Sequence, residues 1–312
     1  MTMDRQVLEE FIPLPLTPSM AAGLHRLTPR QGELKGCVLM LHGFGQDSRI
    51  FLNSDKGVGL AYSLVDQGYE VFICSYRGRN TDNSVLARES FGWQQLVTED
   101  LPLIWRGVEK RCRHNQRFLV GYQQGGVLWS AFLARNPEII NQVSGMIYFN
   151  PYRVCNPVGW LKQLRYGFWE KKVVRSVSAL LGYVPAAWLK HGKANESRKL
   201  LKELHLWQSD RWQDEEDGFD YHQAMTALFF PPSLYFISAH QRWLRREDDS
   251  RAFMFELAGH DGRMIKLSSK AGNKRNYSAL ELCSNKDAES DYYPLLLCWL
   301  QEVAGQKPSA EM

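Results

Sequence analysis

Residues 119–128, LVGYQQGGVL, join an apolar run to a helical pattern through a turn that holds three glycines. A strand and the helix that follows it can approach this closely only where small residues flank the turn, as Gly121, Gly125 and Gly126 do. The middle of the turn is Gln123, whose side chain is a neutral amide that donates and accepts hydrogen bonds. The stretch predicts a strand, a tight turn and a helix, and Gln123 is the residue whose role must be explained.

Short apolar runs alternate with helical patterns on both sides of this turn. The predicted buried strands are 36–42, 69–74, 117–120, 143–150, 233–238 and 264–269. The predicted helices are 57–68, 93–112, 124–137, 250–259 and 287–303. Strands that alternate with helices in this way predict an α/β fold, with a doubly wound, mostly parallel sheet and right-handed crossovers.

The alternation stops at 151–231, where the pattern is helical throughout. We therefore expect a core in two parts, 1–150 and 232–312, with the segment between them inserted as a helical cap above the carboxyl edge of the sheet. The part of the insertion from 151 to 205 holds eleven lysines and arginines against three acids, with apolar residues at helical spacing. Basic amphipathic helices of this kind either pack their apolar faces on the core or meet an anionic membrane or an acidic ligand. The acidic stretch 209–222 could pair with the basic residues.

Composition and motifs limit the classes of protein to which the chain can belong. The net charge of +4 does not argue for nucleic acid, and no run of about eighteen apolar residues predicts a membrane span. The first residues lack the basic and apolar regions of a signal peptide, so a cytoplasmic location is expected. The six cysteines form no C-x-x-C pair and are expected to be buried thiols, not disulfides, in a reducing compartment. The histidines show no metal-binding spacing, so neither a metal nor another cofactor is expected.

Four stretches together resemble the α/β-hydrolases, and most closely the lipase and esterase branch. They are LHGFGQDSRIF (41–51), GYEVFICSYRGRN (68–80), LVGYQQGGVLWSAFLARNP (119–137) and NYSALELCSNKDAESDYYPLLLCWL (276–300). They occur in the order and at the spacing of that family, and the resemblance covers nearly the whole chain. It implies the α/β-hydrolase fold with an inserted helical cap, and a site for acyl transfer that uses a nucleophile, a base and an acid.

The resemblance assigns roles near two turns. Gln123 stands where the family has its nucleophilic serine. Two backbone N–H groups, those of Phe44 and Gln124, would form the oxyanion hole, which does not depend on side-chain identity. With His42 and Gly43 these residues would line a ligand pocket, and His42 is expected to stabilise its turn instead of acting as a base.

The same comparison places the acid and the base. Arg242 stands where a carboxylate would follow the strand 233–238, and the alternative acid position, after the preceding strand, holds Asn150. Two alignments compete for the base. The approach to the last helix places Ala279 there and is preferred on spacing, whereas the sequence ELAGHDG offers His260.

These assignments leave Gln123, Arg242 and Ala279 in place of a catalytic relay. Loss of the nucleophile or the base in a serine protease costs about a million-fold in rate. The expected protein is therefore an inactive member of the family, a pseudoenzyme, that binds a small apolar or acyl ligand or a protein partner. Without chemistry to require it, the strained backbone of the turn could also have relaxed.

The alternative expectation is an active hydrolase whose unusual residues are misaligned in this comparison. His260 and a carboxylate would then meet in the pocket. A nucleophilic cysteine is a further possibility, because Cys74 and Cys155 lie at or near the carboxyl ends of predicted strands.

Overall fold

The computed structural model describes residues 7–52, 59–112, 114–155, 169–189, 192–209, 211–239, 246–257 and 259–306.

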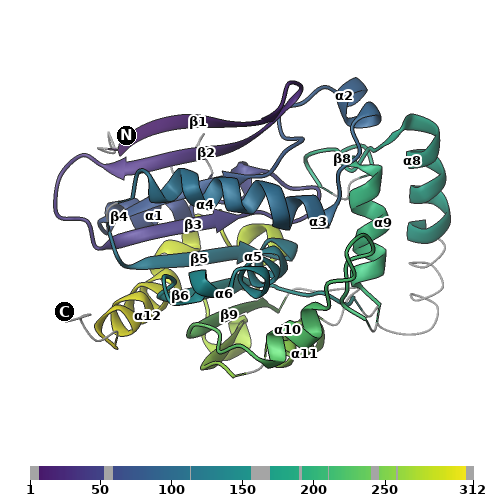
Figure 1. The fold of residues 1–312 in the computed structure, drawn as a ribbon. Helices are drawn as coiled ribbons and strands as arrows, with labels where there is room; N and C mark the ends of the chain where they lie inside the picture. Colours follow the sequence, from purple (N-terminus) through teal and green to yellow (C-terminus); the bar gives the residue numbers. More distant parts are fainter. Residues whose placement is uncertain are drawn as a thin grey trace.

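Eight strands form one twisted sheet in the order β1-β2-β4-β3-β5-β6-β9-β10 (Figure 1). Their bounds are β1 Val7–Thr17, β2 Met20–Pro29, β3 Gly36–Leu41, β4 Tyr69–Ser75, β5 Arg117–Tyr122, β6 Gly145–Phe149, β9 Ser233–Ser238 and β10 Gly262–Leu267. β1, β2 and β4 pair antiparallel, and every other neighbouring pair is parallel. The predicted doubly wound, mostly parallel sheet is confirmed.

Helices cover both faces of this sheet. They are α1 Leu60–Asp66, α2 Asn83–Arg88, α3 Trp93–Gln95, α4 Leu101–Glu109, α5 Gln124–Arg135, α6 Pro137–Ile140, α8 Arg175–Leu181, α9 Arg198–Trp207, α10 Tyr221–Thr226, α11 Arg246–Glu256 and α12 Tyr293–Gln306. A π-helical segment, Leu96–Asp100, joins α3 to α4 without a break. One apolar core lies under α4 and α5, and a second lies on the opposite face under α1 and α12. The predicted helices in the core are confirmed, with ends that shift by up to six residues: α12 begins at Tyr293, and Lys286–Ser290 before it form a 3-10 turn.

The hairpin of β1 and β2 was not among the predicted elements. Pro13 and Pro15 weaken the strand signal of β1, but proline is tolerated there because β1 is at the edge of the sheet. Ile12 and Leu14 are buried, and they alternate with the exposed Pro13 and Pro15. This alternation is the signal by which β1 could have been found.

The fold places two turns at one point of the sheet. β3 has β4 on one side and β5 on the other, so the chain changes direction between β3 and β5. Ligand sites of open α/β sheets form at such a switch point, beyond the carboxyl ends of the strands. Residues 42–46 follow β3 there, and Gln123 follows β5.

The segment between β6 and β9 is not helical throughout, which corrects that expectation. Two short strands, β7 Tyr183–Val184 and β8 Glu196–Ser197, pair antiparallel between the helices. Figure 1 shows α8 and α9 beside each other, beyond the end of the sheet where β5 leads into α5. That arrangement is compatible with a cap, but the domain boundaries at 151 and 231 remain predictions.

Cys37 of β3 and Cys112, beyond α4, are joined in a disulfide, so the expectation that all six cysteines are thiols is wrong for this pair. Their buried positions were expected, but their proximity depends on how α4 packs across the sheet. Cys74, Cys155, Cys283 and Cys298 are not part of a disulfide.

Within the described residues, no helix has both the length and the apolar character needed to cross a membrane.

Candidate active-site region

Gln123 occupies a strained turn between β5 and α5. Its backbone has φ 49° and ψ −119°, a conformation with positive φ that side chains other than glycine rarely adopt. Its N–H donates to the carbonyl of Phe149 at 2.8 Å, which ties the turn to the end of β6. The turn has therefore not relaxed, although an amide has replaced the expected serine.

Backbone packing explains why the turn keeps this geometry. A Cβ atom on Gly121 would overlap with the backbone of Gly126, and one on Gly125 would overlap with the carbonyl of Leu41 in β3. The strand and the helix are in contact at these glycines, so the residue between them cannot move to a relaxed conformation. The strain belongs to the fold of the turn and does not depend on the side chain of Gln123.

The turn after β3 contacts the turn after β5. A Cβ atom on Gly43 would lie 2.8 Å from Oε1 of Gln124 and 3.2 Å from its backbone nitrogen. The N–H groups of Phe44 and Gln124 have no hydrogen-bond partner among the described residues. The structure thus brings together the two backbone segments from which an oxyanion hole would be built. Their use in binding remains a prediction.

His42 is fully buried beneath this turn. Its Nδ1 is 3.1 Å from the carbonyl of Gly43, and its ring packs on Tyr76 with centroids 4.5 Å apart. Burial, followed by the positive charge of Arg79, lowers the pKa of His42 to about 3. His42 is therefore neutral at physiological pH, and its buried Nε2 has no hydrogen-bond partner among the residues that the structure describes. These properties suit a residue that supports the turn.

A buried ion pair anchors the same turn from the other side. The carboxylate of Glu196 accepts hydrogen bonds from the N–H of Gly45 at 2.6 Å and from the hydroxyl of Tyr76 at 2.9 Å, and it pairs with Arg79. The N–H of Lys193 donates to the carbonyl of Gly45 at 2.6 Å. Residues 192–197 are therefore fastened to the turn after β3.

Sequence reasoning missed this network. Arg79 lies within the stretch 68–80 that carries the family resemblance, but nothing in its local pattern indicates a partner more than a hundred residues away. Glu196 is one of only three acids in 151–205, and that isolation is the single signal that could have drawn attention to it.

The acid positions contain no carboxylate among the described residues. Arg242 lies outside the described residues. Asn150, the alternative, is fully buried with φ 47°, and its Oδ1 accepts a hydrogen bond from the N–H of Ser238 at 2.8 Å. Its Nδ2 has no hydrogen-bond partner in the described part of the chain. Farther along, Glu247 on α11 binds Lys266 at 2.6 Å, so it is engaged at the surface.

Ala279 lies, like Gln123, near the carboxyl ends of the strands. It begins a 3-10 turn, Ala279–Glu281, two residues after Tyr277. The carbonyl of Tyr277 accepts a hydrogen bond from the hydroxyl of Ser238, the last residue of β9. The preferred base position is therefore near the carboxyl ends of the strands, and it holds a methyl group.

His260 lies at the amino ends of the strands, opposite the carboxyl ends where Gln123 lies. Through the paired strands, Tyr122 is level with Ile265 of β10. His260 precedes Ile265 by five residues and Gln123 follows Tyr122 by one, so the two differ by six strand positions, or about 20 Å. The structure does not bring His260 to the turn that holds Gln123.

His260 also has partners of its own. Its Nδ1 is 2.8 Å from the carbonyl of Leu257, and its Nε2 is 2.9 Å from the hydroxyl of Tyr235. Burial lowers the pKa of His260, which favours the neutral ring. It is half-buried and hydrogen-bonded, not solvated as a loop histidine would be.

The cysteines offer little chemistry here. Burial raises the pKa of the Cys74 thiol, which disfavours the thiolate needed for attack. Cys37, Cys112 and Glu70 bring three potential metal ligands within 4.8 Å of one another, but the two sulfurs are joined in the disulfide. A metal could bind them only after reduction.

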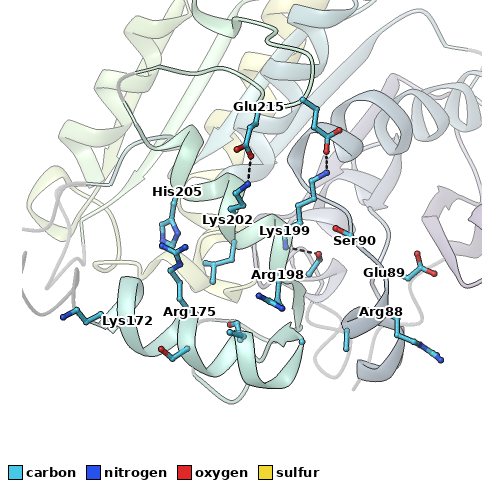
Figure 2. A pocket seen from close by; sticks show the side chains of 18 residues that line it. Arg88, Glu89, Ser90, Lys172, Arg175, Arg198, Lys199, Lys202, His205 and Glu215 are labelled. Atoms are coloured by element: carbon cyan, nitrogen blue, oxygen red, sulfur yellow. Dashed lines mark hydrogen bonds and ion pairs between the residues drawn. The ribbon is translucent and has the colours of Figure 1, made fainter.

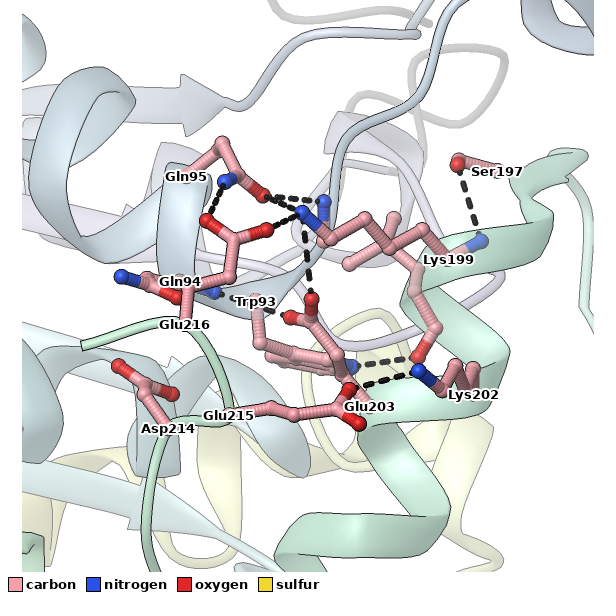
Figure 3. Close-up of polar contacts among 12 residues, drawn as sticks. Trp93, Gln94, Gln95, Ser197, Lys199, Lys202, Glu203, Asp214, Glu215 and Glu216 are labelled. Carbon is pink, nitrogen blue, oxygen red and sulfur yellow. Dashed lines mark hydrogen bonds and ion pairs between the residues drawn. The ribbon is translucent and has the colours of Figure 1, made fainter. Parts of the chain in front are cut away.

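The acidic stretch 209–222 pairs with the basic stretch before it, as predicted (Figure 3). Lys199 pairs with Glu216, and Lys202 lies 2.6 Å from Glu215. Glu203 turns to the core, where it accepts a hydrogen bond from the N–H of Gln94 at 3.2 Å. Glu203 thus links α9 to α3, and the two lysines link α9 to residues 215–216.

Only part of the predicted amphipathic pattern can be followed. Residues 156–168, which hold part of this pattern, lie outside the described residues. At the end of α8, Leu180 is 86% exposed and Leu181 is 40% exposed. This end of α8 is therefore not packed on the core.

Comparisons with known proteins agree with the fold. A model of the family described as serine aminopeptidase, S33, matches residues 32–214. Lipase member K of Mus musculus is 24% identical over 36% of this chain and 30% of its own length. The tear acid lipase-like protein of Mesocricetus auratus is 22% identical over 51% of this chain and 42% of its own length. The chain thus spans less than half the length of these curated relatives.

Solved structures extend the likeness to nearly the whole chain. Monoglyceride lipase from Saccharomyces cerevisiae, solved with a substrate analogue, superposes with a TM-score of 0.62 at 14% identity, over 95% of this chain and 96% of that one. The thioesterase domain from the curacin biosynthetic pathway gives a TM-score of 0.52 at 14% identity, over 93% and 99%. At this identity the likeness shows the fold alone. The family model covers more than half of the sequence, and the chain therefore belongs to the lipase- and esterase-like α/β-hydrolases of the serine aminopeptidase S33 family.

Proposed function

We propose that this chain is a non-catalytic member of its family, which binds a small apolar or acyl ligand, or a protein partner, in place of hydrolysing an ester. The observation that carries the proposal is Gln123, which stands at the strained turn between β5 and α5 with an amide where the family has its nucleophile. An amide cannot form the acyl intermediate of this reaction, but it can donate to and accept from a ligand carbonyl.

The surrounding positions support the same conclusion. Ala279 offers no proton acceptor at the preferred base position, and Asn150 offers no charge at the alternative acid position. His260 lies about 20 Å away along the strands. The backbone N–H groups of Phe44 and Gln124 remain available to a ligand oxygen, so a binding site does not require the lost side chains.

The proposal is tested with a fluorophosphonate probe, which labels only an activated nucleophile, and with short-chain nitrophenyl esters. The wild-type chain is expected to show neither labelling nor turnover above the uncatalysed rate. Gln123→Ser alone is expected to restore little ester turnover, because the base is still absent. Gln123→Ser/Ala279→His is expected to give more turnover than either single change. Gln67→Ser, on the surface at the end of α1, is the matched control for a new serine.

Ligand binding is the second part of the test. Titration with a medium-chain fatty acid is expected to shift the tryptophan fluorescence of the wild-type chain, and Gln123→Ala should weaken that binding about tenfold by removing one hydrogen-bonding side chain. An acylated residue found by mass spectrometry after incubation with an ester would contradict the proposal.

The alternative, an active hydrolase, is favoured by one observation. The strained turn and the unpaired N–H groups beside it are the backbone parts of the family's catalytic site, and both are retained. Turnover by the wild-type chain that disappears in Gln123→Ala would favour this alternative.

The cytoplasmic location expected from the N-terminal residues remains a prediction. The disulfide between Cys37 and Cys112 argues against it, since structural disulfides persist mainly in oxidising compartments.

A further inference from the structure

We propose that the cavity between α8, α9 and the loop after α2 binds a phosphate-bearing anion. The cavity has a volume of about 910 Å³ and opens to solvent (Figure 2). Its walls come from four separate parts of the chain: residues 87–90, residues 172–182 on and before α8, residues 197–205 on α9, and the pair Glu215 and Glu216. Neither Gln123 nor Ala279 lines it, so this inference is independent of the proposed function.

Positive charge dominates the walls of this cavity. Six lysines and arginines line it against three glutamates: Arg88, Lys172, Arg175, Arg198, Lys199 and Lys202 against Glu89, Glu215 and Glu216. Two of the glutamates are already paired with Lys199 and Lys202. The third, Glu89, accepts a hydrogen bond from the hydroxyl of Ser19 at 2.5 Å.

Three arginines are left without a carboxylate among the described residues. Arg175 on α8 and Arg198 on α9 have exposed side chains and make no ion pair with a described residue. Arg88, at the end of α2, donates to the carbonyl of Ser84 at 3.1 Å and has no other hydrogen-bond acceptor among the described residues. Figure 2 shows Arg175 and Arg198 in the space between α8 and α9, with His205 close to Arg175. Guanidinium groups from different helices that face one cavity repel one another unless an anion lies between them.

The chemistry of these groups favours phosphate. A guanidinium presents paired N–H donors that match two oxygens of a phosphate. Ser197, Arg198 and Lys199 line the cavity at the start of α9, a ten-residue helix capped by the hydroxyl of Ser197. The N-terminus of such a helix carries partial positive charge, which adds to the attraction for a dianion.

The phosphate could belong to a small ester or to the headgroup of an anionic lipid. Leu180 on α8 is 86% exposed, and Trp188, a few residues beyond α8, is 71% exposed. Exposed leucine and tryptophan next to basic residues are typical of surfaces that rest on a membrane. A small phosphate monoester and the headgroup of phosphatidic acid supply the same group, and the experiment separates them.

Binding is measured on the full chain by calorimetry with pyrophosphate, and by flotation with phosphatidylcholine vesicles that contain or lack phosphatidic acid. Arg175→Ala and Arg198→Ala are each expected to weaken binding about tenfold, and Arg198→Lys, which keeps the charge but loses the paired donors, by less. Arg263→Ala, an exposed arginine paired with Glu302 on another part of the surface, is the matched control. All three arginines are exposed enough for substitution to leave the fold unchanged.

The results distinguish the sources of the phosphate. Binding of pyrophosphate that depends on Arg175 and Arg198 supports the proposal, with a soluble ester as the ligand if the vesicles remain unbound. Binding to phosphatidic acid vesicles that falls in the same variants and in Leu180→Ser/Trp188→Ser also supports it, with a lipid as the source. Failure to bind either probe, or binding that is unchanged in Arg175→Ala/Arg198→Ala, would overturn it.

Discussion

At Gln123 the backbone conformation and the identity of the side chain have separate explanations. The positive φ is imposed by the contact of β5 with α5, whereas the amide has no covalent chemistry that needs it. Strained conformations of this kind cost about 1–3 kcal/mol. The cost is retained here because relaxation would separate a strand from its helix.

Gln123→Gly is therefore expected to raise the free energy of unfolding by about 1 kcal/mol, since glycine adopts positive φ freely and its greater freedom in the unfolded chain offsets only part of the gain. Gln123→Ala, which keeps the Cβ atom, is the control and should show no gain. Urea denaturation of the three proteins measures the difference. Equal stability of the glycine and alanine variants would show that the turn is not strained.

His42 makes the stability of the protein depend on pH. Its pKa is about 3 in the folded chain, mainly through burial, and about 6.5 when unfolded. Between these values the unfolded chain binds a proton that the folded chain does not bind. The contribution of His42 is therefore fully present above pH 6.5 and is lost as the pH falls, by up to about 1.4 kcal/mol per pH unit.

His42→Gln is expected to flatten the fall in the free energy of unfolding between pH 6.5 and pH 4, whatever its effect on stability at neutral pH. Chemical denaturation at a series of pH values measures the slope. His222→Gln, an exposed position on α10, should leave the slope as it is in the wild-type chain. The same slope in His42→Gln and wild type would mean that the pKa of His42 is not lowered in the folded protein.

Among the helices and strands, the contact between β3, β5 and α5 positions the candidate site. Gly125 lies against the carbonyl of Leu41, so the helix rests directly on the backbone of the neighbouring strand. This contact holds the turns after β3 and β5 together, and with them Phe44 and Gln124. The site is therefore as rigid as the packing of these three elements.

Gly125→Ala is expected to lower the free energy of unfolding by about 3 kcal/mol, because the added methyl group overlaps with backbone atoms that cannot rotate away. Gly305→Ala, in α12, has open space around the new methyl group and should be neutral or stabilising by up to about 1 kcal/mol. Thermal unfolding of both variants compares them. A mild effect of Gly125→Ala would show that α5 can move away from β3.

At the scale of the whole molecule, the disulfide joins β3 to the end of α4 across a sequence separation of 75 residues. Such a link restricts the unfolded chain, and its removal typically costs about 2–4 kcal/mol. Cys37→Ala/Cys112→Ala is expected to lose this amount relative to the oxidised wild type. Cys298→Ser, which removes an exposed free thiol, should have no effect.

Urea denaturation with and without a reductant, combined with a count of free thiols, measures the contribution of the disulfide. Stability that is indifferent to the reductant, together with six titratable thiols in the untreated protein, would mean that the two cysteines are reduced in solution. The original expectation of buried thiols would then hold.

The sequence by itself determined the succession of strands and helices along 36–150 and 233–303, and the position of the turn that holds Gln123. These follow from interactions within a few residues: the apolar runs of the strands, the helical spacing after them, and the glycines that let β5 and α5 touch. For the same reason the identity of the side chains at Gln123 and Ala279 could be compared with a family before any coordinates were known. The β1 strand was missed because its prolines weaken the local strand signal. The structure tolerates these prolines because β1 is an edge strand.

Only the tertiary structure decided which distant residues meet. Glu196 pairs with Arg79, Cys37 joins Cys112, and His260 lies at the sheet edge opposite Gln123. No local pattern contains this information, because each contact depends on how several strands and helices pack at once. The physical reason is that periodicity reports which face of an element is buried, whereas the partner on that face is chosen by the packing of the whole molecule.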